Sequence, residues 1–189
     1  MCERKIGELG HMAVLMIDGL LYAGECIVVA LGVDQQGKKH VLGLLQGASE
    51  NAAVVQGLLD DLMQRGLDAA AKRLYVLDGS KALRSAVHKT FGQAIAVQRC
   101  QIHKRCVPEA LRGSLRSTNL VESAISVVRA TTRRVKRWRA GDMRLRWSAA
   151  GLLAAGKGFR RIRGYKSMSV LIAKVNAFDA TLANQSEAA

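Results

Sequence analysis

Proline occurs once among the 189 residues of this sequence, and aromatic residues make up only 4% of it. A β-sandwich requires many turns and many large ring side chains, so this composition argues against an all-β domain. No stretch of about 18 apolar residues is free of charge, so the sequence indicates no membrane span. The N-terminal residues also lack the apolar core of a signal peptide. Nearly half of the residues are apolar, which is enough for one domain with a substantial core.

Cysteine is scarce as well. The four cysteines, at positions 2, 26, 100 and 106, do not form the dense pattern of a secreted disulfide scaffold. We therefore expect a protein of the reducing cytoplasm.

Acidic residues are outnumbered, since 29 Lys and Arg stand against 15 Asp and Glu. The excess lies in residues 99–166, which hold 18 Lys or Arg and three acidic residues, whereas the rest of the chain is close to neutral. A solvated surface usually mixes both signs. The one-sided charge therefore predicts a polyanionic partner, namely nucleic acid.

The neutral part of the chain alternates strand and helix patterns. Apolar, β-branched runs predict strands at residues 13–17, 25–33, 38–45, 73–77 and 94–98. Apolar residues at helical spacing predict helices over residues 50–64 and from residue 80 onward. The first three strands should form an antiparallel meander, and helical crossovers should lay the later strands parallel to their neighbours. The predicted class is α/β with a mixed sheet, in the element order that is typical of ribonuclease-H-like folds.

The basic part is predicted to be mainly helical. Pro108 and Gly113 indicate a loop, a long helix should cover residues 120–138, and further helices should follow residue 141 and cover residues 167–182. Cations on the long helix and in a later basic turn are the predicted DNA-binding residues. They are Arg129, Arg133, Arg134, Lys136, Arg137, Arg139, Arg160, Arg161 and Arg163.

Three acidic residues are the candidates for chemistry. Asp18 and Asp78 each follow an apolar strand, and parallel pairing of those strands would bring them to one edge of the sheet. Glu122 stands near the start of the basic helix. Converging carboxylates bind Mg²⁺ or Mn²⁺ and serve phosphodiester cleavage. Each residue also has a structural interpretation: Asp18 as a turn residue, Asp78 beside a helix N-terminus, and Glu122 in a capping box with Asn119.

A second cluster combines sulfur and imidazole. Cys100, His103 and Cys106 provide three of the four ligands that a structural zinc requires, and Cys26 or His88 would have to supply the fourth. Alternatively, Cys100 and His103 lie at a strand end and face the acidic site.

Several motifs, in order, resemble the mutator-type transposases of bacterial insertion sequences. They include MIDG at residues 16–19, YVLDGSKALRSAVHKTFG at 75–92, VQRCQIHK at 97–104, LRSTNLVES at 115–123 and the arginine-rich stretch 132–165. The resemblance covers residues 14–165 and implies a ribonuclease-H-like core with a DDE triad. The triad falls on Asp18, Asp78 and Glu122, which also become the metal ligands, and the supporting C-x2-H motif falls on Cys100 and His103.

The resemblance further implies a function and its partners. It implies Mg²⁺- or Mn²⁺-dependent cleavage at element ends and strand transfer, with double-stranded DNA as element end and target. A homo-oligomer is expected in the active state, and the expected location is the bacterial cytoplasm, associated with the nucleoid. Two alternatives stay open: a catalytically dead DNA-binding remnant, and a zinc-stabilised nucleic-acid-binding adaptor.

The sequence departs from the family pattern in two places. Family members carry a DNA-binding region before the first aspartate strand, and a long helical insertion before the glutamate. Here His103 and Glu122 are only 19 positions apart. We therefore predict a remnant at residues 1–12, a catalytic core at 13–140 with an insertion deleted near 105–115, and basic C-terminal helices at 141–189 that pack on the core. The expectation is a degenerate or partial transposase.

Overall fold

The computed structural model describes residues 5–22, 24–47, 52–92, 95–98, 107–138 and 142–186. Its centre is a five-stranded sheet with the strand order β3-β2-β1-β4-β5. The strands are β1 (Met12–Tyr22), β2 (Glu25–Asp34), β3 (Lys39–Gly47), β4 (Leu74–Leu77) and β5 (Ala96–Val97). Strands β1 to β3 pair antiparallel, whereas β4 pairs parallel with both β1 and β5. This arrangement is that of ribonuclease-H-like folds, so the predicted fold class is confirmed.

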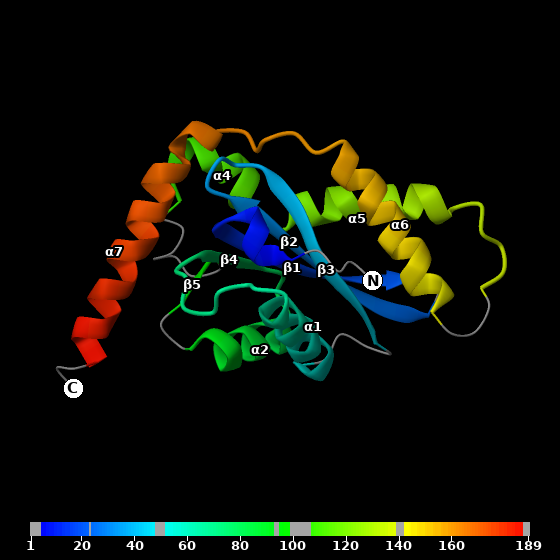
Figure 1. Cartoon of the computed structure of the whole chain (residues 1–189), viewed down its shortest axis with the longest axis horizontal. Coiled ribbons are helices and arrows are strands. Elements are labelled where there is room, and N and C mark those ends of the chain that lie inside the picture. Colours follow the sequence, from blue (N-terminus) through cyan, green and yellow to red (C-terminus); the bar gives the residue numbers. More distant parts are fainter. Residues whose placement is uncertain are drawn as a thin grey trace.

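Helices cover both faces of the sheet, as Figure 1 shows. One face carries α1 (Ala52–Gln64) and α2 (Lys81–Phe91), together with the short 3-10 helix η1 (Ile6–Leu9). The other carries α4 (Glu109–Leu115), α5 (Asn119–Thr132), α6 (Met143–Lys157), η2 (Tyr165–Ser167) and α7 (Met168–Ser186). Each layer has its own buried apolar cluster against the sheet. Within the described residues, no helix is both long and apolar enough to cross a membrane.

Side chains of β1 alternate between the two layers, as the pleat of a strand requires. Val14, Met16 and Leu20 belong to the apolar cluster under α5 and α6, whereas Leu15 and Ile17 belong to the cluster under α1 and α2. Because both faces are covered, the strand is apolar almost without interruption. The one charged residue inside it is therefore an exception that needs an explanation.

Helix α5 ends six residues earlier than the predicted helix over residues 120–138. The described residues after Thr132 form a turn and then an irregular segment. The hydroxyl of Thr132 donates back to the carbonyl of Val128, as β-branched residues at helix ends often do. Cations that follow at positions 133, 134, 136 and 137 would repel one another at helical spacing, which disfavours another turn.

The predicted loop at Pro108 and Gly113 is also wrong. Pro108 precedes α4, and Gly113 lies inside this short helix. Proline is favoured just before a helix because it lacks the N–H that the first turn leaves unpaired. Leu111 and Leu115 are fully buried, so packing against the sheet outweighs the low helix propensity of glycine.

The chain between α6 and α7 is fastened to the tip of the β2–β3 hairpin. The backbone N–H of Ile162 donates to the carbonyl of Gly37, at 2.9 Å. Gly37 has a φ of 76°, and a Cβ built there would lie 2.4 Å from the Cβ of Tyr165. Two features therefore require glycine at position 37: the positive φ angle of the turn and the close approach of Tyr165. The contact fixes the basic turn at residues 160–163 against the sheet.

Helices α5 and α6 cross at a glycine. A Cβ built on Gly151 would lie 2.8 Å from the Cα of Val128, whereas one built on Gly156 in the same helix would meet nothing within 4 Å. Close backbone approach at position 151 therefore depends on the missing side chain.

We expect Gly151→Ala to lower the free energy of unfolding by about 1–3 kcal/mol, because the added methyl group overpacks the helix crossing. Gly156→Ala is the matched control and should leave stability unchanged or raise it by up to about 1 kcal/mol. Urea unfolding followed by circular dichroism measures both. Equal stability of the two variants would contradict the crossing geometry.

Candidate active site

The register of the two parallel strands places the aspartates side by side. Ile17 pairs with Leu77, so the next residues in register are Asp18 and Asp78. Neighbouring strands lie about 4.8 Å apart. Both aspartates follow the alternation that points Val76 and Met16 toward the α5 layer. Asp18 and Asp78 each stand two residues after one of these apolar residues, and side chains two apart in a strand point to the same face. Both carboxylates are therefore directed to the face of the sheet that α5 covers.

Asp18 is the buried member of the pair, with 7% of its surface exposed. It does not end its strand as predicted, because β1 continues to Tyr22. This position excludes the alternative of a turn residue before Gly19. One carboxylate oxygen accepts the backbone N–H of Gly19 at 2.8 Å. Burial is the main reason why the pKa of Asp18 is raised to about 6. Hydrogen bonds from Thr118 and Gly19 oppose this rise, and the charges of Asp78 and Glu122 contribute to it.

Asp78 is exposed and lies one residue beyond the end of β4. Its Oδ1 accepts the backbone N–H of Gly79. The α2 helix that follows is capped by Ser80, whose hydroxyl accepts the N–H of Leu83 at 3.5 Å. Since Ser80 caps the helix, Asp78 is not needed for that purpose, and its carboxylate lies at the sheet edge beside Asp18.

Glu122 lies in the first turn of α5 and is exposed. The helix N-cap is Thr118, and Asn119 is already the first helical residue, so the predicted capping box of Asn119 with Glu122 is wrong. The pKa of Asp18 is raised in part by the charge of Glu122, which places this third carboxylate within electrostatic reach of the first.

Thr118 links two of the three acids and was not foreseen as part of the site. It is 6% exposed, and its hydroxyl lies 3.4 Å from Oε1 of Glu122. The same hydroxyl is also within hydrogen-bond reach of Asp18 and lowers the pKa of that carboxyl. Because the hydroxyl has a single proton, it donates to one of the two carboxylates at a time. In the sequence, Thr118 belongs to a Ser-Thr-Asn run that indicated helix capping. Only the packing of α5 on β1 reveals its second role.

The three carboxylates offer the hard oxygen ligands that Mg²⁺ and Mn²⁺ prefer. Among the described residues, however, no three Asp, Glu, His or Cys side chains lie close enough together to hold one ion. Each acid instead accepts a hydrogen bond from its own surroundings, so binding an ion requires side-chain rotation. Cys100, His103 and Cys106 lie outside the described residues, and Cys26 is buried in β2.

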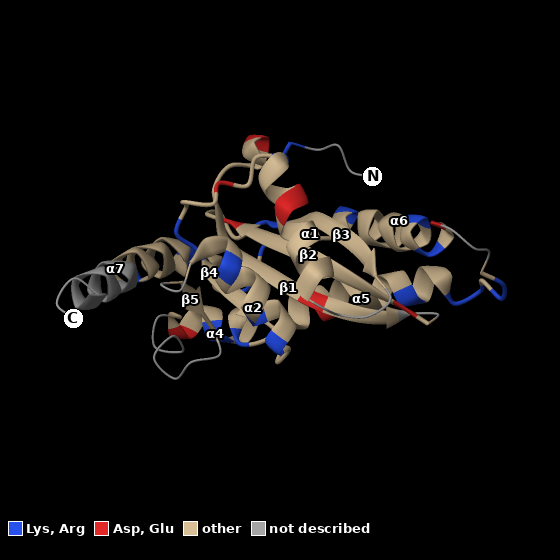
Figure 2. Ribbon diagram, turned by 90° about the horizontal axis from the view of Figure 1, so that it is seen from below, with Lys and Arg blue, Asp and Glu red and all other residues tan. Residues whose placement is uncertain are grey.

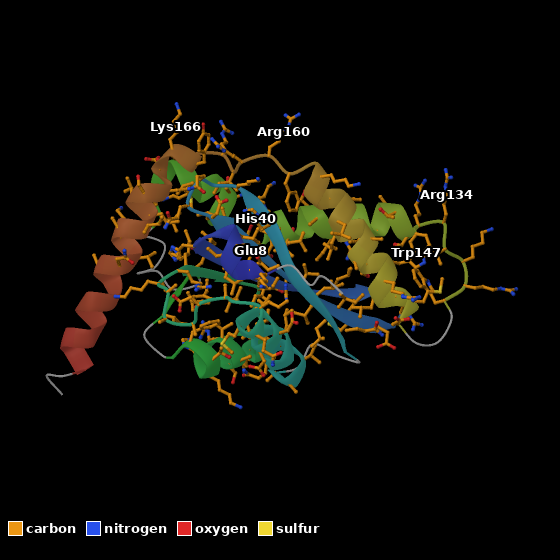
Figure 3. All side chains as sticks on the ribbon, viewed as in Figure 1. Glu8, His40, Arg134, Trp147, Arg160 and Lys166 are labelled. Carbon is orange, nitrogen blue, oxygen red and sulfur yellow. The ribbon has the colours of Figure 1, made fainter. Side chains whose placement is uncertain are left out.

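The predicted DNA-binding cations are exposed wherever the structure describes them. Figure 3 shows Arg134 beyond the end of α5, Arg160 on the connection between α6 and η2, and Lys166 in η2, all pointing away from the sheet. Arg161 lies over the ring of Tyr165, at 5.0 Å from its centroid. The complete set of described candidates is Arg129, Arg133, Arg134, Lys136, Arg137, Arg160, Arg161 and Arg163. Arg139 lies outside the described residues.

Residues 17–106 match the sequence profile described as "Transposase, Mutator family". Over this range the chain is similar to the Mutator-family transposases. The matched range contains Asp18 and Asp78, whereas Glu122 lies beyond its end.

Known relatives agree with the profile. The transposase for insertion sequence element IS905 of Lactococcus lactis subsp. lactis (strain IL1403) is 36% identical over 100 residues, which is 49% of this chain and 25% of that protein. A probable insertion-sequence transposase of Corynebacterium diphtheriae is 34% identical over 95 residues, covering 50% and 27%. The match to this chain thus spans about a quarter of each relative's length.

Among solved structures, the catalytic core domain of BIV integrase aligns with 82% of this chain and 93% of its own. The sequence identity is 13% and the TM-score is 0.48. A likeness at this level adds nothing to the fold assignment, which depends on the strand order of the sheet.

We expect Asp18→Asn to stabilise the metal-free protein at pH 7.5 by about 1 kcal/mol, after allowance for partial hydration of the site. The folded state raises the pKa of Asp18 to about 6. The unfolded value is about 3.9, so ionisation above pH 6 destabilises the fold. Below pH 4 both side chains are neutral and the difference should vanish.

Urea unfolding in EDTA at the two pH values measures this effect. The control is Glu8→Gln, which removes an exposed carboxylate on η1 that forms no ion pair with any described residue, and it should change stability by less than about 0.5 kcal/mol at either pH. A stability gain that does not depend on pH would contradict the burial of a charged Asp18.

Proposed function

We propose that this chain acts on DNA as an insertion-sequence transposase, cleaving and transferring strands with Asp18, Asp78 and Glu122 as its catalytic, metal-binding carboxylates. One observation supports it most: the register of β1 with β4 sets two aspartates side by side on the face where α5 supplies a glutamate. The relationship to Mutator-family transposases gives the reaction class.

The three carboxylates would hold Mg²⁺ or Mn²⁺. Such ions, when bound, stabilise negative charge on the attacking and leaving oxygens of a phosphodiester. Asp18 and Asp78 would supply ligands from adjacent strands, and Glu122 would complete the set from the first turn of α5. Rotation of Asp78 and Glu122 away from their present partners is the movement that this assembly requires. Both are exposed and therefore free of the packing that holds Asp18.

Asp18 has to lose a proton before it can bind a cation. Its pKa, raised to about 6 in the metal-free protein, means that protons compete with the cation near and below that pH. Burial is the main cause, and a cation that enters the site would remove the penalty by compensating the charge. Thr118 orients the Asp18 carboxylate through its hydrogen bond and also contacts Glu122, so it holds β1 and α5 in the relative position that the reaction needs.

The cations at the end of α5 and in the basic turn would bind DNA. They are exposed, they outnumber nearby acids, and the hairpin contact at Gly37 fixes the turn that carries three of them. Arginines along such a surface neutralise phosphates without reading the sequence. The element ends and the target DNA would be bound in this way, with strongly salt-dependent affinity.

We expect Asp78→Asn to abolish Mn²⁺-dependent nicking of supercoiled DNA, with a loss of at least about 100-fold, because one ligand of the metal site is removed. The same variant should keep its affinity for DNA and the salt dependence of that affinity, measured by fluorescence anisotropy. Asp68→Asn, which makes the same charge change outside the site, should nick like the parent protein.

Nicking that persists in Asp78→Asn would refute the carboxylate assignment. Absence of nicking in the parent protein, with DNA binding intact, would instead favour a non-enzymatic DNA-binding remnant.

A further inference from the structure

The polar side of α2 is hollowed and cationic. A hollow of about 760 Å³ lies along this helix and begins at the residue that follows Asp78. Its lining consists of Gly79, Ser80, Lys81, Arg84, Ser85, His88 and Lys89. The spacing of these helical residues is i, i+3, i+4, i+7 and i+8, which is one stripe of an α-helix. Leu83, Ala86 and Val87 form the opposite, buried stripe.

The charge of this stripe has one sign only. Helix α2 contains no acidic residue, and neither Lys81, Arg84 nor Lys89 forms an ion pair with any described residue. The Nδ1 of His88 hydrogen-bonds to the carbonyl of Gly92, at 3.3 Å. An ordinary solvated helix face mixes both signs, because cations then pair with acids at helical spacing.

Lys81 stands where a helix disfavours a cation. It is the first residue of α2, where the backbone dipole is positive and acidic residues are favoured. Arg84 follows within the same turn. Both side chains are exposed, so they cover no apolar surface that would explain their presence. Their position weakens the helix and is understandable if they serve an anionic ligand.

The stripe also lies at the proposed site of chemistry. Asp78, Gly79 and Ser80 connect β4 to α2 without a gap, so Lys81 is three residues from a catalytic carboxylate. Figure 2 shows Lys and Arg on α2, whose buried side belongs to the same apolar cluster as residues of β1 and β4. The arginines at the end of α5 and in the basic turn belong to the opposite layer of the sheet. Cations therefore flank the acids on both layers.

We propose that the α2 stripe binds the phosphate backbone of the DNA that enters the site, with Lys81 and Arg84 as its principal phosphate contacts. This inference rests on the proposed function and extends it. The DNA lies along α2 on one side of the carboxylates and along the arginines of the α5 layer on the other. Phosphates held at Lys81 and Arg84 position the strand beside Asp78.

The test compares Lys81→Ala/Arg84→Ala with a matched control, Lys5→Ala/Lys174→Ala, which removes two exposed cations elsewhere. The probe is a fluorescent DNA duplex in EDTA, followed by anisotropy over a salt series. The α2 variant should bind about 10-fold more weakly at low salt. The slope of log affinity against log salt concentration should become shallower by about 2, because two fewer phosphates are neutralised and correspondingly fewer counterions are released on binding. The charge-conserving Lys81→Arg/Arg84→Lys should restore both values, and the control should keep them.

Stability gives an independent readout. Because the helix disfavours Lys81, the α2 variant should be as stable as the parent or slightly more so, and a lower affinity cannot then be ascribed to unfolding. Equal loss of affinity in the α2 variant and the control would overturn the inference, since the effect would then reflect net charge alone.

The outcomes separate this inference from the proposed function. Nicking that depends on Asp78, together with unchanged DNA affinity in the α2 variant, would refute the α2 surface and leave the chemistry standing. Loss of affinity confined to the α2 variant, without any nicking by the parent protein, would support the surface and refute the chemistry.

Discussion

The parallel pairing of β1 with β4 is the constraint on which the site depends. Its register sets Asp18 beside Asp78, and a slip by one residue would turn one of the two carboxylates to the α2 side. The register is fixed by burial, because Leu74, Val76 and Tyr75 each fill a place in one of the two cores. Apolar packing on both faces of the sheet therefore determines the position of the charged groups.

Packing of α5 on β1 is the second condition, and it depends on the first. Val121 and Ile125 are buried against the sheet, which places Thr118 over Asp18 and Glu122 at the edge. The buried aspartate is tolerated because its hydrogen bonds partly offset the cost of burial. The buried apolar side chains of α5 and the contact of Thr118 at its N-terminus thus both hold α5 in its position on β1.

Sequence patterns predicted the elements that depend on local periodicity. The three antiparallel strands, α1, β4 and α2 follow directly from apolar runs and capping residues, as at Ser80. Asp18 lies inside one of these elements, and Asp78 lies in the short connection between β4 and α2. The length of β1 could not be read from its sequence, because Asp18-Gly19 imitates a turn signal. It is pairing with β2, Asp18 opposite Val29, that carries the strand to Tyr22.

Other features depended on tertiary contacts that sequence patterns do not contain. Helix α4 forms despite Gly113 because Leu111 and Leu115 reach the core. The end of α5 at Thr132 reflects repulsion within a run that has good intrinsic helix propensity. Thr118 could be recognised as a cap from its sequence, but its contact with Asp18 requires a strand about 100 residues earlier in the chain.

The extension of β1 beyond Asp18 has a consequence for how the acids can move. The backbone of Asp18 is held in a ladder that continues for four residues on its far side, to Tyr22. Asp78 lies past the end of its strand, and Glu122 in the first turn of a helix. Amide protons around Asp18 should therefore exchange slowly with solvent, and those in the exposed segment that contains Asp78 should exchange faster. Asp18 therefore has a fixed backbone position, so any rearrangement that the proposed metal site requires has to come from Asp78 and Glu122.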